Sequence, residues 1–181
     1  ATVPSHALCS HEHFRGLMRF LAIFAVLFCS CTLLEAQERT LSKRTFDEAG
    51  DWFTGTTSDG NCTVEADDGV IRYVEVDDNG FRFFSEVVQL DPAKNWSIKM
   101  RVRQTAGEEK HAYGIVFNTA DANNLYQFII RDDSRARIGR IKEGTYENVD
   151  EWTTCNDVKK QGEWNVLEVR KENDAISGYV N

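Results

Sequence analysis

The sequence has few prolines, few basic residues and no low-complexity tract, and each shortage excludes a class of protein. It contains 2 prolines against 12 glycines, and no long run of Ser, Gln or Pro interrupts it, which argues against disorder. Lysine and arginine number 21 against 29 acidic residues, so the net charge is -8. That charge repels phosphate backbones and anionic membrane surfaces, and we therefore expect no nucleic acid partner.

The length and apolar content of the chain suit one packed domain. The sequence has 181 residues, of which 41% are hydrophobic and 11% are aromatic. This is enough apolar material for one core, while the chain is too short for two domains of ordinary size. We therefore expect a single folded domain.

The first methionine opens a segment with the features of a secretory signal peptide. Met18 and Arg19 make a positively charged start, an apolar run covers residues 20–34, and the small residue Ala36 follows. Such a segment is removed on export, so we predict a signal peptide over residues 18–36. The mature protein is then secreted, to the extracellular space or the periplasm.

A signal peptide over residues 18–36 would divide the rest of the chain into a leader and a mature domain. Residues 1–17 precede the start and form an upstream leader outside the mature fold, and residues 37–181 form the domain. Two alternatives stay open, a retained membrane anchor and a lipoprotein acylated at Cys31. The apolar run is shorter than the ~20 residues of a membrane-spanning helix, so we expect no membrane contact beyond the signal segment.

The predicted mature chain keeps two cysteines and two glycosylation sequons. Cys62 and Cys155 could form one disulfide in an oxidising compartment, and two separately buried thiols are an equal alternative. Asn61 in NCT and Asn95 in NWS are candidate glycosylation sites, which matter only if the host glycosylates secreted proteins.

From residue 41 onward the hydrophobic pattern repeats every two residues, which is the period of a β-strand. Polar turn signals such as DDG, DDNG, KEG and END separate the repeating segments. Many short strands joined by such turns predict an all-β, antiparallel sandwich. The segments are NCTVEA, GVIRYVEV, GFRFFSEVVQL, NWSIKMRVR, AYGIVFN, LYQFIIR, RARIGRI, EWNVLEVRK and AISGYV.

The segment NWSIKMRVR shows the alternation most clearly. Successive side chains of a strand face opposite ways, so its apolar residues share one face and its polar residues share the other. We expect the cationic residues Lys99, Arg101 and Arg103 to face solvent, with Glu168 and Glu86 as acidic neighbours. We expect ten apolar residues of three segments to be buried: Trp96, Ile98, Met100, Val102, Tyr113, Ile115, Phe117, Tyr126, Phe128 and Ile130.

Three stretches carry a family resemblance: YGIVFNTADANNLYQFIIRDD, GRIKEG and WTTCNDVKKQGEWNVLEVRKENDAISGYVN. Their order of strands and turns, within residues 43–181, resembles the concanavalin A-like lectin/glucanase superfamily in its laminin G-like and keto-disaccharide hydrolase branch. The resemblance implies a jelly-roll β-sandwich of two curved sheets whose concave face or rim binds glycans. It also implies further strands, so we expect a sandwich truncated at its C-terminus and an appended domain beyond Asn181.

Some members of that superfamily are glycosidases with a Glu-x-Asp-x-x-Glu strand, whose carboxylates act as nucleophile and acid/base. The nearest match here is EVDDNG, where Glu75 and Asp77 fit but Gly80 replaces the second Glu. His111 is the only histidine of residues 37–181, so a Ser-His triad or a histidine zinc site is not indicated. We identify no catalytic residue, and the sequence favours binding over catalysis.

One loop and one aromatic residue are the candidate ligand-binding elements. FNTADANN places Asn118, Asp121, Asn123 and Asn124 between two strong strands, where they could bind a sugar or, through Asp121, calcium. The same residue types also make ordinary tight turns. Trp152 lies in a polar stretch and could stack on a sugar ring, although a tryptophan in a sandwich is more often core.

Three functions remain in view. The first is a secreted, non-catalytic carbohydrate-binding or adhesion module, with a glycan as partner and no cofactor other than calcium. The second is a glycoside-processing enzyme of the same fold, whose catalytic residues are unrecognised or lie beyond Asn181. The third is a structural or protein-interaction sandwich.

Overall fold

The computed structural model describes residues 5–7, 39–47, 52–76 and 82–181, and every regular element in these ranges is a β-strand. The predicted all-β class is therefore confirmed. No helix within these ranges has the length and apolar character needed to cross a membrane. The predicted signal peptide lies outside the described residues.

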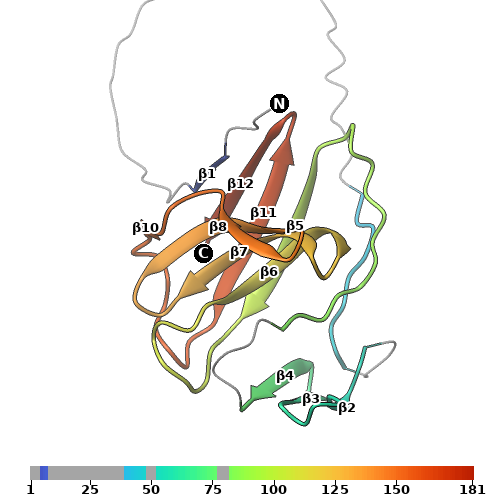
Figure 1. Ribbon diagram of the computed structural model, residues 1–181, viewed down its shortest axis with the longest axis vertical. Helices are drawn as coiled ribbons and strands as arrows, with labels where there is room; N and C mark the ends of the chain where they lie inside the picture. Colours follow the sequence, from blue (N-terminus) through green and yellow to red (C-terminus); the bar gives the residue numbers. More distant parts are fainter. Residues whose placement is uncertain (1–4, 8–38, 48–51, 77–81) are drawn as a thin grey trace, which may run out of the picture. The chain divides into compact units, whose positions relative to one another are not determined.

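The described strands belong to two compact units (Figure 1). The larger unit contains β1 and residues 89–181. One of its sheets has the order β1-β12-β11-β5, and the other has the order β10-β8-β7-β6 with β9 also paired to β8. The bounds are β1 Ser5–Ala7, β5 Trp96–Val102, β6 Tyr113–Asp121, β7 Asn124–Arg131, β8 Arg135–Lys142, β9 Thr145–Asn148, β10 Thr153–Thr154, β11 Asn165–Glu172 and β12 Ala175–Val180.

Nearly all strand pairs in this unit are antiparallel, and β1 is the exception. Its three residues pair in parallel with Ile176, Ser177 and Gly178 of β12. β1 lies within the predicted leader, residues 1–17. Whether that leader is removed from the mature protein stays a prediction.

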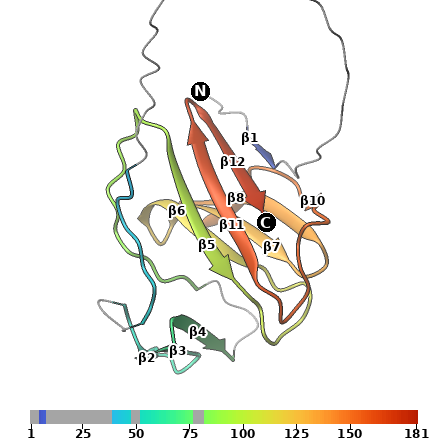
Figure 2. The same ribbon diagram turned by 180° about the vertical axis from the view of Figure 1, so that it is seen from behind.

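The two sheets of the larger unit pack face to face, with β7 and β8 in front in Figure 1 and β5, β11 and β12 in front in Figure 2. Phe128 of β7 is fully buried, and its ring fills the space that a Cβ on Gly178 of β12 would need, with the nearest ring carbon at 2.4 Å. Trp96 of β5 makes an edge contact with Phe117 of β6. The unit is therefore a β-sandwich-like structure with one core between its sheets.

The strand β5 has the register that its alternation predicted. Trp96, Ile98 and Val102 pack against the core, while Lys99 and Arg101 are exposed. The prediction for Met100 was wrong, because this side chain is 39% exposed. β5 is the last strand of its sheet, so Met100 has a strand neighbour on one side only.

The other predicted core residues have different degrees of burial. Ile115, Phe117, Phe128 and Ile130 are buried, whereas Tyr113 and Tyr126 are half-buried against the same core. These residues belong to β6 and β7, the strands whose apolar character was strongest in the sequence.

The smaller unit contains a three-stranded sheet of order β2-β3-β4, with bounds Gly55–Thr56, Cys62–Asp67 and Val70–Glu75. The described residues between 39 and 88 belong to this unit and residues 89–181 to the larger one, and the single domain over residues 37–181 stays a prediction. The core cluster contains only residues of the larger unit, whereas the smaller unit leaves Phe53, Tyr73 and Val76 exposed.

The predicted strand GFRFFSEVVQL is not a strand in its described part, residues 82–90. Its polar side chains bond elsewhere, since Arg82 binds Asp59 and Glu86 binds Arg44. Phe84 stacks on Phe53. Apolar alternation alone was insufficient here, because a strand also needs a neighbouring strand for its backbone hydrogen bonds.

Candidate functional site

The outer face of the sheet that contains β7 and β8 collects arginine and aromatic side chains. Phe128, Ile130 and Ile138 belong to the core cluster, so the alternate residues of these strands face away from the core. Those alternate residues pair across the two strands as Gln127 with Gly139, Ile129 with Arg137 and Arg131 with Arg135.

Trp152, which precedes β10, lies over arginines of this face. The guanidinium carbon of Arg137 is 4.1 Å from the centroid of the indole ring, and that of Arg131 is 4.6 Å away. Nη1 of Arg135 donates to the Trp152 carbonyl oxygen at 3.3 Å. Cation–π contacts hold the ring in place. Trp152 is therefore a partly exposed aromatic surface of the kind on which a sugar ring can stack.

Two buried polar atoms near Trp152 have no hydrogen-bond partner in the described structure: Oε1 of Gln127 and Nε of Arg137. Gln127 is 3% exposed. It pairs with Gly139, two residues along β8 from Arg137, so the two side chains are diagonal neighbours on one face. A buried donor and a buried acceptor left unpaired both cost free energy. Hydroxyl groups both donate and accept, so they match the chemistry of both atoms.

Tyr146 of β9 forms an exposed border beside these atoms. A Cβ on Gly139 would lie 2.2 Å from the Tyr146 hydroxyl oxygen, so glycine at this position makes room for the phenol. The Arg137 guanidinium lies over the Tyr146 ring, and its Nη1 donates to Oδ1 of Asn148 at 2.8 Å. Burial lowers the pKa of Arg137, which means that its positive charge is poorly solvated.

The predicted loop residues lie at the other end of β7 from Trp152. Oδ1 of Asp121 accepts hydrogen bonds from the Asn123 backbone at 2.7 Å and the Asn124 side chain at 3.1 Å. Oδ1 of Asn124 accepts from the Glu143 backbone at 3.1 Å. These oxygens close the β6–β7 turn and join it to the β8–β9 turn. About 17 Å of strand separates Asn124 from the level of Arg137, and about 23 Å separates it from Arg131, by the usual rise per residue.

Asn118 does not share in that turn. It lies in an irregular part of β6, where the register with β7 shifts between Phe117 and Asp121, and it has a φ of 50°. The structure thus brings Asp121, Asn123 and Asn124 together and leaves Asn118 and Trp152 apart from them. Binding of a sugar or calcium by the loop stays a prediction.

The outer face of the opposite sheet carries the cationic row of β5. Nζ of Lys99 binds Oε2 of Glu168 at 3.3 Å, which confirms one predicted acidic neighbour. Arg101 and Arg103 instead place their guanidinium groups over the Trp164 ring, at 4.8 and 4.5 Å. The prediction for Glu86 was wrong, because this residue binds Arg44 of the smaller unit.

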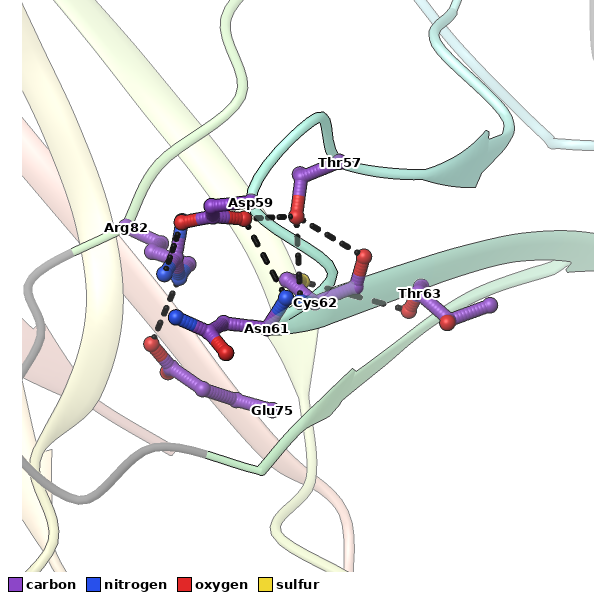
Figure 3. A network of polar contacts seen from close by, with 7 residues as sticks. All are labelled: Thr57, Asp59, Asn61, Cys62, Thr63, Glu75 and Arg82. Carbon is purple, nitrogen blue, oxygen red and sulfur yellow. Dashed lines mark hydrogen bonds and ion pairs between the residues drawn. The ribbon is translucent and has the colours of Figure 1, made fainter.

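The smaller unit holds a separate polar network (Figure 3). Arg82 lies between two carboxylates, 2.7 Å from Asp59 and 2.9 Å from Glu75. Hydrogen bonds from the Thr57 hydroxyl, the Asn61 backbone and Arg82 lower the pKa of Asp59 to about 2. Glu75, the first residue of the incomplete glycosidase pattern, is therefore held in an ion pair. The other two positions of that pattern, 77 and 80, lie outside the described residues.

The two cysteines are buried thiols in the structure, Cys62 in the smaller unit and Cys155 in the larger. Both side chains are buried, and both alternatives, a disulfide and two separate thiols, stay predictions. Of the sequon residues, Asn61 is half-buried, and Asn95 is exposed and accepts a hydrogen bond from the Asn173 backbone through Oδ1. Glycosylation stays a prediction.

The part of the chain that the structure describes contains no group of three or more His, Cys, Asp or Glu residues placed to hold a metal ion. The candidate site consists of Trp152 with the polar groups beneath and beside it. Sequence reasoning singled out Trp152 but missed Gln127, Arg137 and Tyr146. A signal was present, because Gln127 is the one polar residue inside the apolar run LYQFII.

Comparison with known proteins adds no identification. No protein-family model, no curated protein and no solved structure matches the chain. The resemblance to the concanavalin A-like superfamily therefore remains a prediction.

Proposed function

We propose that this chain is a secreted, non-catalytic carbohydrate-binding or adhesion module with a concanavalin A-like jelly-roll fold. One observation carries the proposal: the fixed ring of Trp152 stands on the same face as the unpaired buried atoms of Gln127 and Arg137. A sugar offers an apolar ring face and hydroxyl groups together. One ligand would stack on the indole and, once the side chains that cover these solvent-inaccessible atoms move aside, pair its hydroxyl groups with the acceptor and the donor.

The test is a binding screen of the full chain against a glycan panel, followed by titration of the best glycan. Trp152→Ala should weaken binding by at least about tenfold, since it removes a central aromatic contact. Trp164→Ala is the matched control, because Trp164 also lies under two arginines but on the opposite sheet. The affinity of the Trp164→Ala variant for the glycan should stay within about twofold of the affinity of the unaltered chain.

A reducing-sugar assay on the same glycans separates the alternatives. Binding without turnover supports the module. Turnover would favour the glycoside-processing enzyme, and the absence of both binding and turnover across the panel would favour a structural or protein-interaction role. Thermal melting of each variant shows whether a lost affinity reflects a lost fold.

A further inference from the structure

We infer that the glycan bound beside Trp152 is acidic, with a carboxylate or a sulfate group held by Arg135 and Arg137. This inference rests on the proposed function, because it names the class of ligand for the same site. Both arginines lie on β8, two residues apart, so their side chains leave the same face of the sheet.

Neither arginine has a carboxylate within salt-bridge distance in the described structure. Most of the other described arginines do form a salt bridge with a carboxylate. Arg131, on the same face, is bound by Asp133 through two hydrogen bonds. The arginines that hold a carboxylate are Arg44, Arg72, Arg82, Arg131, Arg140 and Arg170.

The partners of Arg135 and Arg137 are neutral groups that orient them without neutralising them. Arg135 donates to the Trp152 carbonyl oxygen, and Arg137 donates to the Asn148 side chain and lies over Trp152 and Tyr146. Nε of Arg137 has no acceptor. A planar guanidinium with a donor unused matches an oxyanion, which accepts paired hydrogen bonds from it.

Three acidic residues lie close to this pair: Asp133, Glu151 and Asp150, whose backbone N–H donates to the carbonyl oxygen of Ile138, next to Arg137. Asp133 is already bound by Arg131, and the charges of Arg135 and Lys110 act on it only at longer range. Glu151 acts on Arg137 through its charge but makes no salt bridge with it. An anionic group on a ligand would therefore supply the partner that the protein does not.

The pair Arg101 and Arg103 on the opposite sheet has no carboxylate partner either, but it lacks the other features of the site. Both residues are exposed, whereas Arg137 is partly buried. Oε1 of Gln104, next to Arg103, is buried without a partner, but it is an acceptor and cannot bind an anion. The neighbouring Lys99 is already bound by Glu168. This pair is consequently the matched control for Arg135 and Arg137.

The experiment titrates the full chain with two matched pairs of probes. One pair is oligogalacturonate and its methyl ester, which differ in the carboxylate. The other pair is dextran sulfate oligosaccharide and dextran oligosaccharide, which differ in the sulfate. We expect one acidic probe to bind at least about tenfold more tightly than its neutral partner, with a preference that shrinks as salt rises.

Variants assign that preference to the site. Arg137→Gln and Arg135→Gln should each remove most of the preference for the acidic probe. Arg137→Lys should keep only part of that preference, because lysine retains the charge but lacks the planar guanidinium. Arg101→Gln should leave it unchanged. Thermal melting identifies any variant that fails to fold, and Arg135→Gln, at an exposed position, serves if Arg137→Gln does not fold.

Three results would overturn the inference. Equal binding of acidic and neutral probes would leave the proposed function standing and refute the acidic ligand. A preference removed by Arg101→Gln but not by Arg137→Gln would place the anion on the opposite sheet. A chain that binds no probe of either pair and no member of the wider panel would refute both the inference and the proposed function.

Discussion

At the residue scale, the larger unit contains a buried carboxylate with a single side-chain donor. Asp132 is 1% exposed, its Oδ1 accepts the Tyr113 hydroxyl at 2.6 Å, and its Oδ2 has no hydrogen-bond partner among the described residues. Asn165 donates to the same hydroxyl at 3.4 Å. Burial and the neighbouring Asp132 raise the pKa of Tyr113 well above that of a solvated phenol, so it stays protonated and continues to donate.

We predict that Tyr113→Phe destabilises the fold by roughly 1–3 kcal/mol, because the substitution leaves the buried Asp132 carboxylate without its donor. Urea denaturation measures the loss. Tyr179→Phe is the control, since Tyr179 contacts Arg170 through its ring rather than its hydroxyl. Equal stability of the two variants would show that the bond to Asp132 contributes nothing.

The ion pairs of Glu168 make stability depend on pH. Hydrogen bonds from Arg170, then from Lys99, lower the pKa of Glu168 below its usual value of 4.5. A carboxylate with a lowered pKa in the folded state stabilises the protein above its unfolded pKa, and this contribution is lost as the pH falls through the folded pKa.

We therefore predict that Glu168→Gln lowers the free energy of unfolding at about pH 6 more than at about pH 3. Denaturant titrations at the two pH values measure the difference. Glu172→Gln, at the exposed end of the same strand, should show a smaller pH effect. A loss for Glu168→Gln that is the same at both values would contradict the assigned ion pairs.

At the element scale, the two sheets approach closely where Phe128 of β7 meets Gly178 of β12. A Cβ at position 178 would lie 2.4 Å from a ring carbon of Phe128, which is too close for any real contact. We predict that Gly178→Ala destabilises the fold by roughly 1–3 kcal/mol through overpacking. Ser177→Ala, one position earlier on β12, should cost less.

A second substitution checks the cause of that loss. Phe128→Leu combined with Gly178→Ala should be less destabilising than the sum of the two single changes, because the smaller side chain makes room for the methyl group. Strict additivity of the two losses would mean that the cost of Gly178→Ala arises elsewhere.

At the scale of the whole molecule, the core cluster lies entirely within residues 89–181. The smaller unit contributes no residue to it, and several of its large apolar side chains are exposed. We predict that a fragment of residues 89–181 unfolds cooperatively and gives the circular dichroism of β-structure. A fragment without a cooperative transition would show that the core depends on the rest of the chain.

Several elements and their faces were predictable from sequence, because alternation is a local property of a strand. β5, β6, β7, β8, β11 and β12 lie within two or three residues of their predicted bounds. The strand β9 and the short strand β10 were missed, since four or two residues hold too little alternation to detect. The segment 82–90 was predicted wrongly, because its pattern resembled a strand for which the fold provides no partner.

Local patterns in the chain were thus enough to predict the all-β class, the inward and outward faces of most strands, and Trp152 as a candidate contact. The side chains that surround this tryptophan could be found only from the folded arrangement of the strands. Arg131 and Arg137 reach Trp152 because the register of β7 with β8 sets them on one face, and because the chain returns there after β9. The register of β7 with β8 and the course of the chain after β9 depend on contacts between residues far apart in the sequence. A local sequence pattern contains no information about such contacts.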